Sequence, residues 1–277
     1  MINFNGELHH SDTIKLTPEN RAFKYGDAIF ETVKVIYHKV VFWEDHYFRL
    51  MSSMRMLRMK IPMEFTLEFL ENEILKTVAV QDAAISYRVR LNIFRKDGGL
   101  YTPKTNKIDY SIHANENLYQ VKDSYSLDVF KDFYNYSGLL STIKTNNRML
   151  NTLASIFAKE NDLDNCILLN EKKRVVEVTN GNIFIVKGTV IKTPALSEGC
   201  IKGITRSKVI DIILKNSEFT LEETSISPFE IQKADEVFIT NAIIGLQPVF
   251  RYKKKNLISK VGQKIANNLN ILQIAGS

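Results

Sequence analysis

Three residues and one helix start in this sequence have groups that could do chemistry together. Lys144 lies in the polar run STIKTNNR and would supply an amine that can bond to a carbonyl carbon. Glu177 would supply a carboxylate, and Arg49 a permanent cation. The segment Gly203-Ile204-Thr205 opens a helical pattern, and the backbone N–H groups at a helix start bind anions. The set therefore combines an amine, a carboxylate and an anion-binding region.

Together these features match what pyridoxal phosphate requires of a protein: an amine for its aldehyde, a carboxylate for its ring nitrogen and a cup for its phosphate. Each feature also has a plainer explanation. Lys144 could be a solvated lysine, Glu177 an exposed strand residue, and the glycine-led segment only a helix start. Arg49 could pair with Glu44 or Asp45 on its own helix. Their joint occurrence favours the cofactor interpretation.

Other chemistries lack a motif in this chain. There is no HExxH, no GxGxxG and no clustered DxD, and no serine or cysteine lies in a recognisable nucleophile setting. Cys166 and Cys200 are far apart and are expected to be buried thiols, so the sequence predicts neither a disulfide nor a metal site. The five histidines are scattered along the chain: His9, His10, His38, His46 and His113.

The composition is that of a soluble globular protein. The 277 residues are 44% hydrophobic and 25% charged, which suits two domains. No apolar run approaches the roughly 20 residues of a membrane span, and the start has no signal-peptide pattern, so we expect a cytoplasmic protein without a membrane partner. The net charge of +6 comes from 37 basic and 31 acidic residues that are interleaved. The one basic run, 253–255, indicates a solvated turn and not a nucleic-acid site.

The elements that must position these residues alternate between strand and helix patterns. Strand-like runs at 28–43, 85–94 and 108–114 surround two helical ones, which indicates a small α+β unit. A polar stretch at 115–122 is the candidate linker. Beyond it come a helix near 150–157, a strand meander over 166–194, a helix opened by Gly203 and a helix begun by a capping box at Ser227. The second unit is therefore also mixed.

Six segments carry a resemblance to a known family. They are RAFKYGDAIFETVKV (21–35), HYFRL (46–50), IKTNNR (143–148), EVTNGNIF (177–184), KGITR (202–206) and FITNAIIGLQPV (238–249). In order and spacing the chain resembles the class IV aminotransferases, the fold type IV pyridoxal phosphate enzymes that include branched-chain and D-amino-acid aminotransferases and 4-amino-4-deoxychorismate lyase. The resemblance implies pyridoxal 5'-phosphate as cofactor and spans most of the chain.

The resemblance also implies roles for single residues. Lys144 resembles the catalytic Schiff-base lysine, Arg49 the arginine that grips the cofactor phosphate, and Glu177 the carboxylate that faces the pyridine nitrogen. The remaining cofactor-binding residues that it implies lie in the helix start and in the last turn: Ile204, Thr205, Asn241 and Ala242.

The resemblance implies a D-amino-acid aminotransferase-like fold in two domains. These are a small N-terminal α+β domain over 1–114, a linker over 115–122, and a large cofactor-binding domain over 123–277 with a barrel-like sheet and helices. It also implies a homodimer acting on a small molecule. Tyr101, Arg88 and Arg90 are possible substrate contacts, because they lie on or after the third strand of the small domain.

The leading expectation within the family is 4-amino-4-deoxychorismate lyase, which makes 4-aminobenzoate and pyruvate for folate synthesis. Met149 and Ala242 stand where similar branched-chain enzymes have a tyrosine and a threonine, which counts against that branch. Leu100 stands where such lyases often have an arginine. The alternatives are a branched-chain or D-amino-acid aminotransferase that uses a 2-oxo acid, and a cofactor-free binding protein of the same fold.

Overall fold

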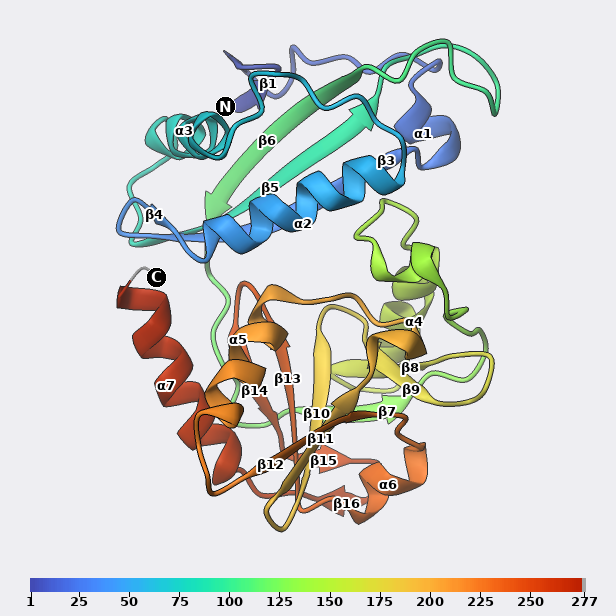
Figure 1. Ribbon diagram of the computed structural model, residues 1–277, viewed down its shortest axis with the longest axis vertical. Coiled ribbons are helices and arrows are strands. Elements are labelled where there is room, and N and C mark those ends of the chain that lie inside the picture. Colours follow the sequence, from blue (N-terminus) through green and yellow to red (C-terminus); the bar gives the residue numbers. More distant parts are fainter. Residues whose placement is uncertain (276–277) are drawn as a thin grey trace. The chain divides into compact units, whose positions relative to one another are not determined.

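A computed structural model describes residues 1–275 (Figure 1). The chain forms two compact units. Unit 1 contains residues 1–118, the short segment 144–147 and the chain from residue 273, and unit 2 contains residues 119–143 and 148–272. The division after Leu118 falls within the linker expected at 115–122. The segment that holds Lys144 belongs to unit 1, although the sequence pattern had placed it in the second domain.

Unit 1 is built on a six-stranded antiparallel sheet with the strand order β2-β1-β6-β5-β3-β4. Its strands are β1 (Ile2–Phe4), β2 (Glu7–His9), β3 (Ala28–Ile36), β4 (Lys39–Val40), β5 (Ser86–Arg95) and β6 (Ile108–Glu116). Its helices are α1 (Arg21–Tyr25), α2 (Trp43–Met56) and α3 (Leu67–Ala79). Helices α2 and α3 pack on the sheet through apolar side chains such as Leu50, Met54 and Ile74, which are fully buried.

The strand run expected at 28–43 contains a hairpin and the start of a helix. Tyr37 and His38 take positive φ angles of 47° and 61°, and this two-residue turn connects β3 to β4. The expected strand run therefore ends before residue 43, because the chain enters α2 at Trp43, which is buried.

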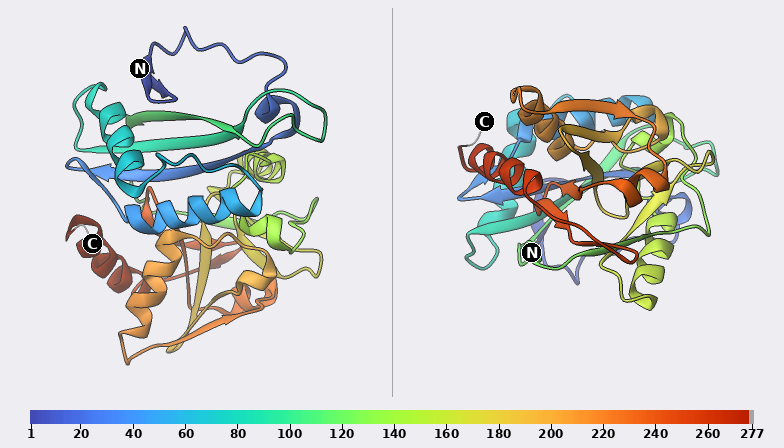
Figure 2. Two further views of the ribbon diagram at one scale, coloured as in Figure 1. Left: turned by 45° about the horizontal axis from the view of Figure 1, so that its top comes forward. Right: turned by 90° about the horizontal axis from the view of Figure 1, so that it is seen from below.

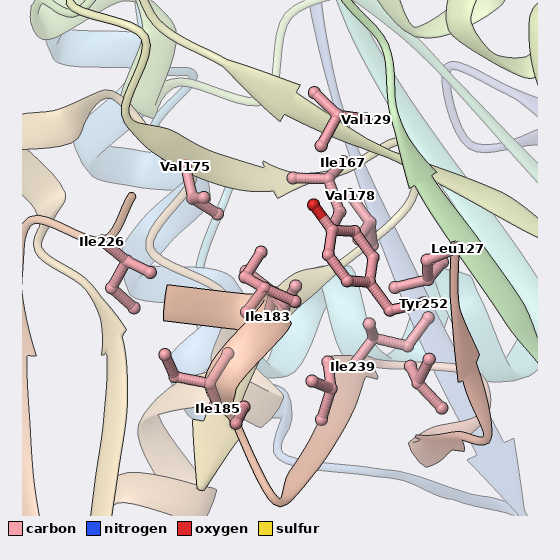
Figure 3. Packing of buried hydrophobic residues seen from close by; sticks show 14 of the residues in the cluster. Leu127, Val129, Ile167, Val175, Val178, Ile183, Ile185, Ile226, Ile239 and Tyr252 are labelled. Carbon is pink, nitrogen blue, oxygen red and sulfur yellow. The ribbon is translucent and has the colours of Figure 1, made fainter. Parts of the chain in front are cut away.

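Unit 2 contains two five-stranded sheets, ordered β12-β11-β10-β13-β14 and β16-β15-β7-β8-β9. The strands are β7 (Ser126–Val129), β8 (Asn165–Leu169), β9 (Val175–Val178), β10 (Asn182–Lys187), β11 (Val190–Pro194), β12 (Thr220–Thr224), β13 (Glu236–Asn241), β14 (Gly245–Val249), β15 (Arg251–Tyr252) and β16 (Lys255–Asn256). Figure 3 shows the core formed by strands of both sheets, with Leu127, Ile167 and Ile239 near the Tyr252 ring. These two sheets correspond to the barrel-like sheet that the resemblance implies for the large domain.

Four α-helices belong wholly or mostly to unit 2: α4 (Met149–Glu160), α5 (Ile204–Leu214), α6 (Pro228–Lys233) and α7 (Val261–Ala275), whose residues up to Leu272 are in this unit. Short 3₁₀ turns, η1 (Leu139–Thr142) and η2 (Leu196–Glu198), precede α4 and α5. Helices α5 and α7 lie side by side (Figures 1 and 2). Helix α7 packs closely on β13, since a Cβ at Gly262 would be 3.5 Å from the Phe238 ring. The capping box predicted at Ser227 is present, with Glu230 as its partner. Within residues 1–275, no helix is both long enough and apolar enough to cross a membrane.

Candidate functional site

The segment that carries Lys144 runs beside the start of β3. Its carbonyl accepts a hydrogen bond from the Phe30 N–H at 2.9 Å, and the Asn146 N–H donates to the Ala28 carbonyl at 2.9 Å. Thr145 forms an antiparallel bridge with Ile29 between these two bonds. The backbone of Lys144 is therefore held as an added strand, although no regular element was predicted there.

The Lys144 side chain is half-buried above an aromatic ring. Its Nζ is 4.4 Å from the centre of the Phe30 ring, and Phe30 is itself buried. The Arg90 guanidinium is 3.7 Å from the centre of the same ring, and it donates to the amide oxygens of Asn92 at 2.8 Å and Asn146 at 3.2 Å. An aromatic face attracts both cations. Lys144 is thus not the fully solvated lysine of the plainer explanation.

Arg49 of α2 pairs with Glu31 of β3. The Arg49 Nε and Nη2 groups donate to the two Glu31 carboxylate oxygens at 2.8 and 2.5 Å. His46, one turn before Arg49, lies with its Nδ1 2.8 Å from the same carboxylate. Glu31 and His46 are both buried, so the strand and the helix share a bidentate ion pair with little solvent around it.

The charge state of this cluster follows from its burial and its partners. Burial raises the pKa of the Glu31 carboxyl, but the Arg49 charge and the hydrogen bonds from His46 and Arg49 outweigh burial and lower that pKa to about 2. Burial lowers the pKa of His46, Glu31 opposes this change, and the charges of Arg49 and Lys144 add to it. At neutral pH Glu31 is ionised and His46 is neutral, and the His46 Nδ1–H donates to the carboxylate.

Glu177 is a buried residue of β9, with 4% of its surface exposed, and not the solvent-facing strand residue of the plainer explanation. Its Oε2 accepts a hydrogen bond from the Ile201 N–H at 3.0 Å. The Ile201 carbonyl in turn accepts from the Asn182 Nδ2 at 2.9 Å and from the Gly203 N–H at 2.8 Å. A buried carboxylate fixed in this way suits a ligand that presents a cationic N–H group.

Helix α5 begins directly after this loop. Its N-cap residue is Gly203, which has no side chain to satisfy the first N–H groups of the helix. Ile204 and Thr205, the first two residues of the 11-residue helix, are both buried. A helix start with this geometry suits a phosphate, because its N–H groups and its dipole both favour an anion.

Asn241 and Ala242 lie where β13 turns into β14. The Asn241 Oδ1 accepts hydrogen bonds from the N–H groups of Ile243 and Ile244 at 3.0 and 2.9 Å. The Asn241 side-chain oxygen therefore shapes the turn itself. The assignment of both residues to cofactor binding stays a prediction.

The structure groups the predicted residues in two sets. Arg49 and Lys144 belong to unit 1, while Glu177, Ile204 and Thr205 belong to unit 2. Sequence reasoning missed Glu31 and His46, although both lie in segments that carry the resemblance and His46 precedes Arg49 by three residues on one helix. It also missed Asn182 and Phe30, because their contacts depend on chain segments far apart in sequence.

The three possible substrate contacts differ in setting. Arg90 lies over the Phe30 ring, whereas Arg88 is half-buried two residues away on β5. Tyr101 is 89% exposed and packs its ring against Tyr25, with the ring centres 5.6 Å apart. Arg90 thus contacts the Phe30 ring that the lysine amine also contacts. Over residues 1–275 no group of three or more histidine, cysteine or acidic side chains is arranged to hold a metal ion.

Comparison with known proteins decides the family. The family model for class IV amino-transferases matches residues 28–252. The chain belongs to the class IV aminotransferases. A protein assigned as a branched-chain-amino-acid aminotransferase in Methanocaldococcus jannaschii is 30% identical over 97% of this chain and 93% of its own length. The aminodeoxychorismate lyase of Vibrio harveyi is 26% identical over 91% of this chain and 94% of its own.

The crystal structure of the Thermoproteus uzoniensis branched-chain aminotransferase with norvaline matches the fold with a TM-score of 0.92. The two sequences are 24% identical, and the match covers 100% of this chain and 95% of the Thermoproteus uzoniensis chain. The fold class predicted from the sequence is thereby confirmed. So are the predictions of a class IV enzyme and of pyridoxal phosphate as its cofactor. Buried Glu177, the α5 start and Lys144 have the donor and acceptor chemistry that this cofactor requires.

Proposed function

We propose that this protein is an aminotransferase that moves the amino group of a small amino acid, with branched-chain amino acids as the first candidates, to a 2-oxo acid. The observation that carries the proposal is the Lys144 amine, which the backbone pairing with β3 holds above the Phe30 ring. The 30% identity to the Methanocaldococcus jannaschii protein over nearly the whole chain supports this activity over the lyase that the sequence pattern favoured.

Pyridoxal phosphate, when bound, supplies an aldehyde carbon for amino groups and a ring that accepts electrons. Lys144 would hold that aldehyde carbon, and its amine would take the proton from the substrate Cα. Glu177 would accept a hydrogen bond from the ring N–H and favour its protonated form. The apolar ring of Phe30 excludes water beside the lysine amine.

The phosphate is assigned to the remaining predicted residues. We assign its oxygens to the Ile204 and Thr205 N–H groups and to Arg49, whose guanidinium Glu31 binds along one edge. We also assign Asn241 and Ala242 of the β13–β14 turn to phosphate binding. Arg90 is the proposed partner of a substrate carboxylate, because its guanidinium lies over the Phe30 ring that the Lys144 amine also contacts.

A second candidate is 4-amino-4-deoxychorismate lyase. Met149 and Ala242 favour it, since similar branched-chain enzymes have a tyrosine and a threonine at these positions. The Vibrio harveyi relative also favours it. Both candidate reactions need Lys144 to remove the first proton from the substrate. They differ in whether a 2-oxo acid is required as the amino-group acceptor.

The deciding experiment compares the two reactions in one preparation loaded with pyridoxal phosphate. We expect L-leucine or L-valine with 2-oxoglutarate to give glutamate and the branched 2-oxo acid, measured by chromatography. D-Alanine serves as the donor of opposite configuration. Release of 4-aminobenzoate from 4-amino-4-deoxychorismate without any 2-oxo acid, together with no amino transfer, would establish the lyase instead.

Replacing Lys144 by Ala tests the central residue. We expect K144A to lose all measurable amino transfer, because alanine has no amine to bind the cofactor carbon or to take the substrate proton. Lys34→Ala is the matched control, because Lys34 is a partly buried lysine of β3, the strand that pairs with the Lys144 segment. The K34A variant should keep its amino-transfer activity. Activity of K144A close to that of the unchanged protein would refute the assignment.

We also propose that the protein works as a homodimer. Phe23, Leu100 and Tyr101 of unit 1 are 79%, 74% and 89% exposed. They are held together because Arg21, which begins α1, donates a hydrogen bond to the Leu100 carbonyl at 2.6 Å. A group of large exposed apolar side chains at one place favours a protein partner.

A further inference from the structure

One asparagine binds the loop that joins the two parts of the proposed cofactor site in unit 2, Glu177 and the start of α5. Asn182 is the first residue of β10, with 5% of its surface exposed, and its Nδ2 donates to the Ile201 carbonyl at 2.9 Å. The N–H of the same Ile201 donates to the Glu177 carboxylate at 3.0 Å. Asn182 thus binds the carbonyl of Ile201, the residue whose N–H binds the Glu177 carboxylate.

The same loop leads into helix α5. Gly203 follows Ile201 by two residues, donates its N–H to the Ile201 carbonyl at 2.8 Å, and is the N-cap of the helix. The carbonyl of Ile201 therefore receives the asparagine amide and the N-cap N–H together. A movement of this carbonyl would displace the start of helix α5 and also the Ile201 N–H, which donates to Glu177.

Gly203 shows how closely the asparagine fits against this loop. A Cβ at this position would lie 2.1 Å from the Asn182 Oδ1, nearer than atoms approach without displacement. The backbone of Gly203, with φ −68° and ψ 136°, is open to any residue. A methyl group at this position would have to displace the Asn182 side chain, whereas the backbone conformation itself sets no demand for glycine.

We propose that Asn182 is a positioning residue that fixes, through the Ile201 peptide, both the direction of the Glu177 carboxylate and the start of helix α5. The inference rests on the proposed function, since it concerns how this chain prepares Glu177 and the helix for the cofactor. Asn182 acts through its neighbours. Its loss should weaken cofactor binding and also alter the ring protonation that Glu177 controls.

The test uses Asn182→Ala, and Thr193→Val as the matched control. Thr193 is fully buried in the same sheet and donates its hydroxyl to the Ile183 carbonyl at 2.9 Å, so its variant also loses one buried bond to a carbonyl. We expect N182A to raise the Kd for pyridoxal phosphate about tenfold and to shift the pH profile of the bound-cofactor absorbance. T193V should change neither. A general loss of stability would not move that profile.

Gly203→Ala and the double variant test the contact itself. In G203A the new methyl group pushes the asparagine side chain away, so the same shift of the pH profile is expected. In N182A/G203A the methyl group occupies the vacated space, so the Kd should stay near that of N182A and should not rise by the product of the two effects. If N182A does not fold, G203A alone decides.

The outcomes separate the inference from the function on which it rests. Failure of the unchanged protein to bind pyridoxal phosphate would overturn both. Binding by the unchanged protein, with a Kd and a pH profile in N182A or G203A equal to its own, would overturn only the role of Asn182. Multiplicative effects in the double variant would overturn it as well.

Discussion

At the scale of single residues, the buried and ionised Glu31 makes the stability of this protein depend on pH. Its two oxygens bind Arg49, and its burial would otherwise favour the neutral acid. The pKa of about 2 in the folded protein lies below the ordinary value of 4.5. A lowered carboxyl pKa stabilises the fold above the ordinary pKa, and this stability is lost as pH falls toward the folded-state value.

We therefore expect the free energy of unfolding to fall between about pH 4.5 and pH 2 by about 3 kcal/mol on account of Glu31 alone. In Glu31→Gln this part of the pH dependence should be absent, while stability at pH 7 should be lower because Arg49 loses its charged partner. Urea unfolding at several pH values measures both effects. The exposed Glu7→Gln serves as control, and equal pH slopes in E31Q and the unchanged protein would contradict the assignment.

At the scale of elements, local sequence patterns were sufficient where local chemistry decides the structure. The helix at Ser227 was predicted because serine, proline and glutamate have defined roles in its first turn, and the structure shows both capping-box hydrogen bonds. The segment of Lys144 could not be predicted to pair with β3. Its partner lies more than a hundred residues earlier, and the pairing uses backbone groups that any sequence provides.

The capping box gives a prediction for element stability. Ser227→Ala removes the side chain that accepts from the Glu230 N–H, so the protein should lose about 1 kcal/mol of unfolding free energy. Amino transfer at low temperature should be unchanged, because α6 carries none of the proposed site residues. Chemical denaturation measures the loss, with the exposed Ser217→Ala as control. Equal losses in both variants would show that the cap contributes nothing specific.

At the scale of the whole molecule, the sequence was enough to predict the mixed fold and the family, because the six motifs occur in family order along most of the chain. It was not enough to predict the cluster of Glu31, His46 and Arg49 or the contact of Asn182 with Ile201. The first joins strand β3 to helix α2 and the second joins β10 to the loop before α5, so both depend on how separate elements pack. The same limit applies to the choice between lyase and aminotransferase, because both use the same lysine.

The exposed apolar side chains of unit 1 give the prediction for assembly. Light scattering should give about twice the 31.8 kDa of one chain. Leu100→Asp should shift the mass toward one chain, because a carboxylate cannot be buried in an apolar contact without a partner. Ile85→Asp is the control: Ile85 is 67% exposed and precedes β5, whereas Leu100 follows that strand. A mass of one chain for the unchanged protein would refute the dimer, and equal masses for L100D and the unchanged dimer would place the contact elsewhere.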